Sequence, residues 1–509
     1  MRGHVGDWDM NADGPDNEPP TEYEELLSRY ERLVNLHYAG TYLHWDQQVM
    51  MPDGGATGRA GQLSAISATH HELLVDDAVE GWLSALDGAS LSTDQSACIR
   101  EIRRQHERAA RVPSELVEAI TRTAAESQQI WQDAKAEDDF ESFAPRLEQL
   151  RELQIERAEY IDPEKPPYQV MFEDAFPYID FETVEDIFDT LRESLPPLIE
   201  RIRDSGRAIE TSFDGSYTEA DQRALSKAVL DDLGYDRQRG RLDTAPHPFM
   251  AGNQFDARIT TRYGENDPLE ALTATIHEFG HATYQLGLRQ EAYGSPLGES
   301  RGSIHESQSR FWENHIGRTK AFWDVITPTA SDYLGIPDLT AREAFESSNR
   351  VKPDNLIRVE ADELTYHLHI ILRCEIDQAF VAGDIDVMDI PALWNDKMEE
   401  YLGVRPETDS EGCLQDIHWT SRFAAFQPYT LGSVVAAQLD RAIRDELAVD
   451  DLVRSREFDT LREWMTEHVH RHGQRYETPE LIERAAGEPL SADPFVDYAE
   501  NKFAELYAV

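Results

Sequence analysis

The segment from Asp267 to Gly287 constrains this chain more than any other, because it carries the pattern His-Glu-x-x-His inside a well-marked helix. Asp267 can cap the helix, Pro268 suits its first position, and Glu270 stands where a capping box has its acidic partner. Gly287 is a typical stop. Apolar residues recur at helical spacing between these ends and predict a buried face: Leu269, Leu272, Ile276, Phe279 and Leu286.

Two histidines of this helix form a candidate metal site. His277 and His281 are four residues apart, so both imidazoles lie on one helix face and can bind the same ion. Glu278 lies beside that face and can take a proton from a metal-bound water, which makes it the candidate general base. Because the pattern also arises by chance, it needs a third ligand to support it.

Glu306 is the candidate third ligand, since catalytic zinc is usually held by three protein groups with water in the fourth position. The chain between His281 and Glu306 is long enough for a turn and a second, antiparallel helix that returns a carboxylate to the metal. His305 competes for the same role. Ser303 and Glu306 also match a Ser-x-x-Glu capping box, in which Glu306 would only begin a helix. Spacing alone leaves these alternatives open.

The acidity of the chain is a second constraint. There are 98 acidic and 48 basic residues among 509, with a formal net charge of -50, while the 40% hydrophobic content is that of a folded protein. Such a surface repels itself in dilute buffer, but at about 1 M salt the Debye length falls to about 3 Å. We therefore expect a halophilic protein whose surface is unsuited to binding nucleic acid.

No targeting segment is evident in the sequence. No stretch approaches the roughly 18 to 20 apolar residues of a membrane span, so no membrane is expected as a partner. Residues 1–20 are acidic and lack the apolar core of a secretion signal, which predicts a flexible tail and a cytoplasmic protein. No repeat or linker interrupts the rest, so residues 21–509 are predicted to form one catalytic domain.

Most of the chain has helical periodicity. One exception is the run 255–263, whose β-branched and aromatic residues predict a strand just before the metal helix. An edge strand in that place can hold a peptide in extended form. The predicted fold is therefore mostly α, with a deep substrate cleft and a small β-sheet beside the metal helix. Helices are expected at 23–38, 94–111, 113–135, 143–161, 183–204, 218–233, 355–381 and 432–447.

Six short motifs follow one another in a fixed order. They are His247-Pro248-Phe249, Asp256-Ala257-Arg258-Ile259-Thr260, His277 to His281, His305-Glu306-Ser307-Gln308, Ile357-Arg358-Val359-Glu360-Ala361-Asp362, and Gly412-Cys413-Leu414-Gln415-Asp416-Ile417-His418-Trp419. Each alone is weak, but in this order they resemble the carboxypeptidase Taq family of thermostable zinc metallocarboxypeptidases, over roughly residues 21–509.

The resemblance implies a mostly helical homodimer that removes the C-terminal residue of peptides with a free C-terminus. It implies broad specificity that excludes C-terminal proline, and one Zn²⁺ per subunit that Co²⁺ can replace. In the family the Glu of His-Glu-Ser-Gln binds the metal, which here is Glu306, so His305 would support the site.

The family motifs also supply candidates for substrate binding. Arg358 is the first choice for the free α-carboxylate, because a planar guanidinium binds a carboxylate through two hydrogen bonds. Its alternative role is an i,i+4 ion pair with Asp362 on one helix face. Gln415 and His418 are expected nearby, and Arg258 either contacts substrate or supports the fold.

The tetrahedral intermediate needs a further donor, for which His418 and Tyr429 are candidates. Asp416 could orient a ligand imidazole or simply cap a helix. One segment departs from the family pattern, since residues 420–432 are shorter and poorer in glycine, which leaves the position of Tyr429 open.

Two other functions stay open. A zinc endopeptidase or oligopeptidase can use the same ligands, and would cut inside a peptide whose C-terminus is amidated. A non-catalytic peptide-binding or metal-binding protein is the other alternative, against which the intact Glu278 argues.

Overall fold

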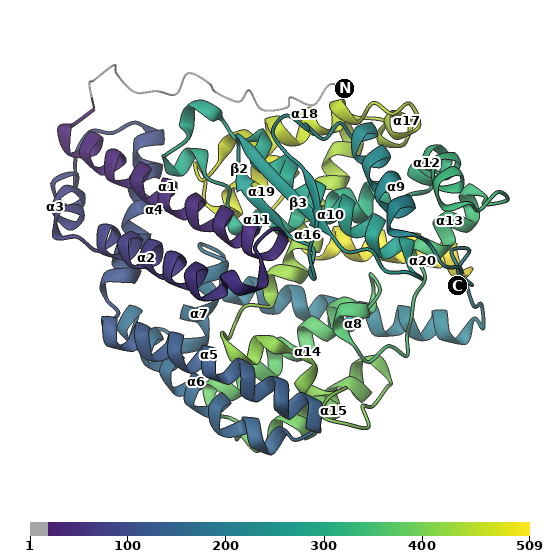
Figure 1. Ribbon diagram of the computed structural model, residues 1–509, viewed down its shortest axis with the longest axis horizontal. Helices are drawn as coiled ribbons and strands as arrows, with labels where there is room; N and C mark the ends of the chain where they lie inside the picture. Colours follow the sequence, from purple (N-terminus) through teal and green to yellow (C-terminus); the bar gives the residue numbers. More distant parts are fainter. Residues whose placement is uncertain (1–18) are drawn as a thin grey trace.

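The computed structural model describes residues 19–509, and this part of the chain is built mainly from helices around one small sheet (Figure 1). The predicted mostly α fold with a small sheet beside the metal helix is therefore confirmed. Residues 1–18, most of the predicted tail, lie outside the described residues, and the single domain over 21–509 stays a prediction.

The strands are β1 (Leu242–Thr244), β2 (Met250–Asn253) and β3 (Asp256–Thr261). The α-helices are α1 (Thr21–Val49), α2 (Ala56–Leu74), α3 (Asp77–Ala85), α4 (Thr93–Ala110), α5 (Ser114–Glu137), α6 (Phe140–Ile161), α7 (Pro167–Ala175), α8 (Phe181–Asp204), α9 (Glu219–Asp232), α10 (Pro268–Gly287), α11 (Gly302–Arg310), α12 (Lys320–Leu334), α13 (Ala341–Ser348), α14 (Thr365–Ala382), α15 (Ile390–Leu402), α16 (Gln427–Glu446), α17 (Val449–Arg454), α18 (Phe458–His468), α19 (Thr478–Ala486) and α20 (Asp493–Tyr507).

The prediction of one helix over 355–381 is wrong in its first third. Residues Arg358–Glu360 form only a short 3-10 helix, η5, and α14 begins at Thr365. Asp362 starts α14 by accepting hydrogen bonds from the backbone N–H groups of Leu364 and Thr365, at 2.9 and 3.1 Å. A side chain used in this way favours a helix start over a helix interior, so the preceding residues turn away from the helix axis.

The sheet has the strand order β1-β3-β2, so the predicted strand at 255–263 is its central member, β3. β1 runs parallel to β3, with Leu242 opposite Ile259, and β2 runs antiparallel, with Met250 opposite the same residue. Among the described strands β2 pairs with β3 alone, so no described strand covers its outer edge, and α1 also packs against β2. Helix α10 packs against β2 and β3 (Figure 1).

Helix α16 lies between the two larger hydrophobic cores. Leu431 and Val434 belong to a core that α5–α8, α14, α15 and α20 share, whereas Val435 and Leu439 belong to a core around α9–α12 and the sheet. A third core joins α1, α3 and α4. No helix within residues 19–509 is both long and apolar enough to cross a membrane.

Candidate metal centre and active site

The start of α10 is fixed as predicted, except for the capping box. The Asp267 carboxylate accepts hydrogen bonds from two backbone N–H groups of the first turn, at 3.1 Å each, and Pro268 is the first helical residue. Glu270 does not complete a capping box, because its carboxylate forms an ion pair with Arg262 instead. The helix ends at Gly287, as expected.

Two glycines allow α11 to lie unusually close to its neighbours. A Cβ at Gly280 of α10 would lie 2.5 Å from the carbonyl oxygen of Gln308 on α11. A Cβ at Gly432 of α16 would overlap Cγ and Cβ of Glu306. Any larger residue at either position would push the helices apart, so both glycines hold Glu306 against α10.

Glu306 joins the two histidines of α10 in one cluster. Its Oε2 lies 3.8 Å from Nε2 of His277 and 3.5 Å from Nε2 of His281. Their candidate ligand atoms all lie within 4.8 Å of one another. The alternative capping role of Glu306 is wrong, because α11 has no side-chain cap and Ser303 contacts the Thr478 hydroxyl at 2.7 Å.

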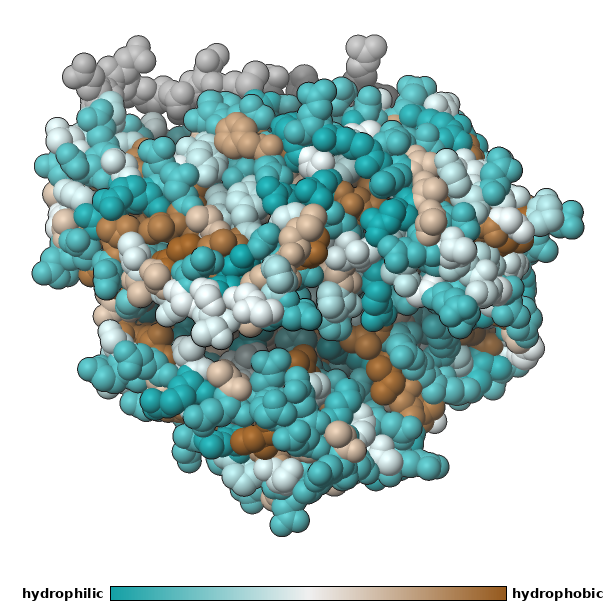
Figure 2. All heavy atoms as spheres, in the orientation of Figure 1, coloured by the Kyte–Doolittle hydropathy of each residue, from teal (hydrophilic) through white to brown (hydrophobic). Residues whose placement is uncertain are grey.

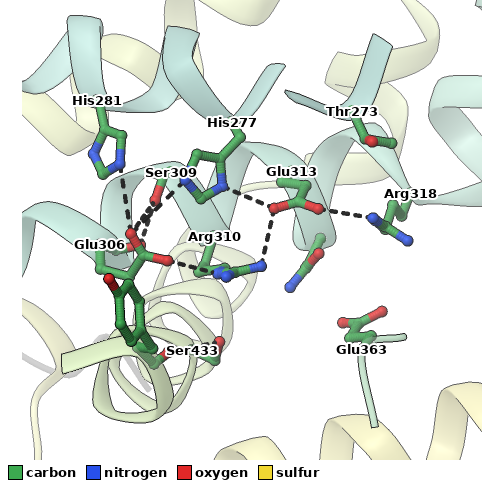
Figure 3. Close-up of polar contacts among 12 residues, drawn as sticks. Thr273, His277, His281, Glu306, Ser309, Arg310, Glu313, Arg318, Glu363 and Ser433 are labelled. Atoms are coloured by element: carbon green, nitrogen blue, oxygen red, sulfur yellow. Dashed lines mark hydrogen bonds and ion pairs between the residues drawn. The ribbon is translucent and has the colours of Figure 1, made fainter. Parts of the chain in front are cut away.

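The hydrogen bonds of the two rings suit a metal site. Nδ1 of His277 donates to the Glu313 carboxylate at 2.9 Å, and Nδ1 of His281 donates to the His305 carbonyl at 3.0 Å. In the neutral form that a metal ligand needs, each ring then has Nε2 free, and Figure 3 shows both rings directed at Glu306. Two imidazoles and one carboxylate with free lone pairs fit a catalytic zinc ion.

His305 lies behind His281 and not among the ligand atoms. Its Nδ1 is 2.7 Å from Nδ1 of His281. Burial lowers the pKa of His305 well below its ordinary value, and the neighbouring His281 lowers it further. A neutral ring in this place supports the orientation of His281, which agrees with the supporting role expected for it.

Glu313 is the functional side chain that the sequence reasoning missed. Besides His277, it accepts hydrogen bonds from Arg310 at 3.2 Å and from Arg318 at 2.8 Å (Figure 3). Burial would raise its pKa, but Arg318, Arg310 and His277 outweigh burial and hold the pKa well below its usual range. Glu313 is thus a fixed negative charge that orients His277, a candidate metal ligand.

The position of Glu313 depends on an uncommon helix. Directly after α11, residues Phe311–Gly317 form a π-helix, η4. Such wide turns are rare and often occur at functional sites. The sequence signal for Glu313 was its position two helical turns after Glu306. Regular helical spacing does not predict, however, in which direction a side chain points from a π-helix.

We expect Glu313→Gln to weaken metal binding by about 10- to 100-fold, because the amide gives His277 a weaker acceptor. Competition with a chelator of known affinity measures the change. Glu400→Gln, an exposed substitution on α15, is the control and should bind metal as the wild type does. Unchanged affinity in Glu313→Gln would mean that Glu313 does not orient His277.

Glu278 faces a cavity of about 840 Å³ that opens beside the metal cluster. It is 5% exposed, and its Oε2 has no hydrogen-bond partner in the described part of the chain. Burial raises the pKa of Glu278 above its usual range, against the lowering influence of His281 and His277. An unpartnered carboxylate oxygen with a raised pKa is suited to accept a proton. Figure 2 shows this face of the molecule hollowed between the region of α9 and α10 and that of α14 and α15.

Arg358 lines this cavity, and its backbone is held from far along the chain. Oε1 of Gln415 accepts a hydrogen bond from the Arg358 N–H at 2.8 Å. The Arg358 guanidinium lies 3.7 Å from Asp416 and over the ring of Phe426 at 5.0 Å. The alternative i,i+4 ion pair with Asp362 is wrong, since no continuous helix joins the two residues.

Gln415 and His418 support this wall of the site, and neither is among the side chains that line the cavity. The Gln415 amide donates to the carbonyls of Leu356 and Glu411, at 3.0 and 2.7 Å, so both ends of the amide bind backbone. Nδ1 of His418 lies 2.7 Å from Asp416. Gln415 therefore positions Arg358, in a different role from the direct substrate contact expected of it.

Asp416 does not orient a metal ligand, so that part of its prediction is wrong. It contacts His418, whose backbone N–H it also accepts at 3.1 Å as the cap of a short 3-10 helix, which is the alternative we gave for it. It also accepts a hydrogen bond from Arg373 at 2.8 Å. Burial would raise the pKa of Asp416, but His418, Arg373 and Arg358 hold it well below its ordinary value.

Arg258 and Tyr429 take different positions. Arg258 pairs with Asp256 at 2.6 Å and lies over the Trp45 ring at 4.3 Å, which is its expected role in support of the fold. Burial raises the pKa of Tyr429, the charge of Glu306 raises it further, and Arg358 opposes both. Tyr429 is not among the residues that line the active-site cavity, but its pKa responds to the charges of Glu306 and Arg358.

The glycine-poor segment before Tyr429 makes its turn with an alanine. Ala424 has φ 51°, in the left-handed region that favours glycine. Its backbone N–H donates to the buried Asp377 at 2.7 Å, which holds the turn. This departure from the family pattern leaves Tyr429 at the start of α16.

Comparison with known proteins decides the family. The family model of the carboxypeptidase Taq (M32) metallopeptidases matches residues 25–503. The chain belongs to the carboxypeptidase Taq (M32) family. It is 35% identical to thermostable carboxypeptidase 1 of Thermus thermophilus over 508 residues, covering 96% of this chain and 99% of that protein.

Solved structures of M32 carboxypeptidases have the same fold. The M32 carboxypeptidase of Deinococcus radiodurans aligns with a TM-score of 0.93 at 35% identity, covering 96% of this chain and 100% of that one. The carboxypeptidase of Pyrococcus furiosus, in an apo-Mg structure, aligns with a TM-score of 0.92 at 33% identity, covering 96% and 99%. This M32 protein is therefore a metallocarboxypeptidase, a hydrolase that acts on peptide bonds.

Proposed function

We propose that this M32 carboxypeptidase is a zinc enzyme that releases the C-terminal residue of peptides with a free α-carboxylate. Its specificity is broad and excludes C-terminal proline. The observation that carries the proposal is the cluster of His277, His281 and Glu306 next to Glu278, whose Oε2 has no partner among the described residues.

His277, His281 and Glu306 would hold one Zn²⁺ per subunit, with Co²⁺ as a substitute. When bound, the ion lowers the pKa of water and polarises the carbonyl of the scissile bond. Burial would raise the pKa of Glu306, but Arg310 and the two histidines outweigh it and keep the carboxylate ionised, as a ligand must be.

Glu278 acts as the general base and then as the general acid. It takes a proton from the attacking water and delivers that proton to the leaving amine. Tyr429 is our candidate for the donor that stabilises the oxyanion, because the charges of Glu306 and Arg358 both act on the pKa of its hydroxyl. His418 is the second candidate, with its Nδ1 held by Asp416 at 2.7 Å.

Arg358 binds the α-carboxylate of the substrate. Its guanidinium lies over Phe426, and one of its nitrogens is 3.7 Å from Asp416. Because a guanidinium has five N–H donors, others are left for a second carboxylate. A binding site for the free C-terminus on the cavity wall explains exopeptidase action, since a peptide without that charge gains nothing from Arg358.

The net charge of the chain bears on the conditions in which the enzyme works. We propose that the enzyme works in a halophile's cytoplasm, as a homodimer, where salt screens its net charge of -50. Figure 2 supports this with a face covered mainly by hydrophilic side chains. The same charge disfavours nucleic acid as a partner.

Mass spectrometry of a free-acid peptide incubated with zinc-loaded protein in high salt tests the proposal. We expect a ladder that shortens from the C-terminus and stops before proline. The amidated form of the same peptide should remain intact. Internal cuts in the amidated peptide would favour an endopeptidase, and no cleavage of either peptide would favour a non-catalytic binding protein.

A further inference from the structure

A second cavity, of about 450 Å³, lies at the other end of the metal-binding face of α10. Thr273, His277, His281 and Gln285 follow one another at intervals of four and so share one face of the helix. Thr273 and His277 line the active-site cavity, whereas Gln285 lines the second cavity. The metal ligands thus lie between two cavities.

The edge strand β2 connects the same two cavities. His247 and Pro248, just before the strand, line the active-site cavity, and residues 250–252 of the strand line the second. The outer edge of β2 has no partner among the described strands, so it can pair with an extended peptide. A peptide whose C-terminal carboxylate lies at Arg358 therefore has a path that leads its preceding residues to the second cavity.

Three side-chain oxygens of the second cavity, which His37 and His70 also line, have no hydrogen-bond partner among the described residues. Glu299 accepts one hydrogen bond, from the Tyr38 hydroxyl to Oε2 at 3.0 Å, and its buried Oε1 has none within the described chain. Oε1 of Gln285, a residue that is 6% exposed, and Oε1 of Gln474 are unpartnered as well. Both amide nitrogens instead donate to Ser300, at 3.0 Å each.

The isolation of Glu299 from positive charge is unusual in this molecule. No Arg or Lys is among the described residues that line its cavity, and burial raises the pKa of Glu299 to about 7 against the hydrogen bond from Tyr38. Glu299 itself is half-buried. Within residues 19–509 the fully buried carboxylates have an Arg or Lys partner, apart from Asp362, which accepts several hydrogen bonds, and Glu278. The paired ones are Glu101, Glu313, Glu363, Asp377, Asp416 and Asp440.

Glu299 therefore shares with Glu278 the signature of a side chain kept for a ligand. A buried acceptor without a partner is costly, and it persists where a bound molecule supplies the missing hydrogen bond. A carboxylate and two amide oxygens without partners favour a ligand that donates hydrogen bonds and carries positive charge. An ammonium group carries three donors and a guanidinium five, which matches this set.

We propose that the second cavity binds a positively charged group of the peptide substrate on the N-terminal side of the scissile bond, with Glu299 as its counter-ion. The group is a Lys or Arg side chain or the N-terminal ammonium. This inference rests on the proposed function, since it takes the peptide to lie along α10 with its C-terminus at Arg358.

A set of free-acid hexapeptides tests the inference. The peptides differ only in having Lys or Gln at one of the four positions before the released residue, and each is made with a free and an acetylated N-terminus. The measured quantity is kcat/KM for release of the C-terminal residue by the zinc-loaded enzyme. We expect the positive charge at one position, or the free N-terminus, to raise kcat/KM about tenfold.

The variants separate this charge effect from general damage. Glu299→Gln should lose the preference while hydrolysing the neutral, acetylated peptide at nearly the wild-type rate, and Glu299→Asp should retain part of the preference. Glu291→Gln changes an exposed residue in the segment between α10 and α11 that also contains Glu299, and it should behave as the wild type does.

Each outcome decides the matter. A preference for Lys that Glu299→Gln removes supports a side-chain site, and a preference for the free N-terminus that it removes supports an ammonium site. Equal rates for all peptides, or a preference that survives in Glu299→Gln, overturns the inference. If no peptide is hydrolysed, the proposed function fails instead, and calorimetric binding of the same peptides to wild type and Glu299→Gln then decides whether the cavity selects a cation.

Discussion

Glu278→Gln is expected to lower kcat by about 10²- to 10⁴-fold and to leave the metal content unchanged. The amide has nearly the shape of the carboxylate, but it cannot take a proton from water. Glu278 is not part of the His277, His281 and Glu306 cluster, so the metal keeps all three ligands. Steady-state hydrolysis of a free-acid peptide gives kcat, and elemental analysis gives the metal bound per subunit.

The burial of Glu278 makes this substitution informative. Because its Oε2 has no partner among the described residues, an amide nitrogen there leaves no other group without its hydrogen bond. Thermal unfolding should therefore stay close to that of the wild type. Glu483→Gln, an exposed substitution on α19, is the control for the change of charge. A Glu278→Gln enzyme that binds metal and keeps more than about a tenth of its turnover would mean that another group is the base.

The part of the site that lies within α10 could be predicted from the sequence. The Asp267 cap, the Pro268 start and the shared face of His277 and His281 all depend on neighbours within one helix, so local spacing predicts them. The long helices away from the site follow the same rule. The bounds of α4 agree closely, at Thr93–Ala110 against the expected 94–111, whereas α1 runs to Val49, eleven residues beyond the predicted end at 38.

The choice of the third candidate ligand depends on tertiary packing, which sequence spacing does not contain. The sequence left Glu306 in competition with His305 and with a capping role. Gly280 and Gly432 resolve that competition, because only a residue without a Cβ lets α10 and α16 approach α11 so closely. Their importance shows only once the three helices are packed together.

The side of the active-site cavity that contains Arg358 was hardest to predict. Arg358 and Asp362 have the spacing of an ion pair on one helix, but Asp362 instead begins α14 and Gln415 holds the Arg358 backbone. Both effects come from hydrogen bonds that override helix propensity, one of them between residues far apart in sequence. Glu313 was missed for a related reason, since it lies in a π-helix that regular spacing does not describe.

Arg358→Met is expected to lower kcat/KM for free-acid peptides by about 10²- to 10³-fold, mainly through KM. Methionine keeps an unbranched, flexible side chain against Phe426 but cannot bind the α-carboxylate. Asp416 keeps its hydrogen bonds with Arg373 and His418, so this wall of the cavity is retained. Hydrolysis of one peptide as free acid and as amide, by both enzymes, measures the effect.

The comparison of the two peptides distinguishes carboxylate binding from structural damage. In the wild type, amidation should remove most of the activity. In Arg358→Met, amidation should cause little further loss, because the charge that it removes no longer has a partner. Lys352→Met is the matched control, since Lys352 is an exposed cation that lines the same cavity. If amidation were as harmful in Arg358→Met as in the wild type, the substrate carboxylate would bind elsewhere, and Arg358 would only hold Asp416 in place.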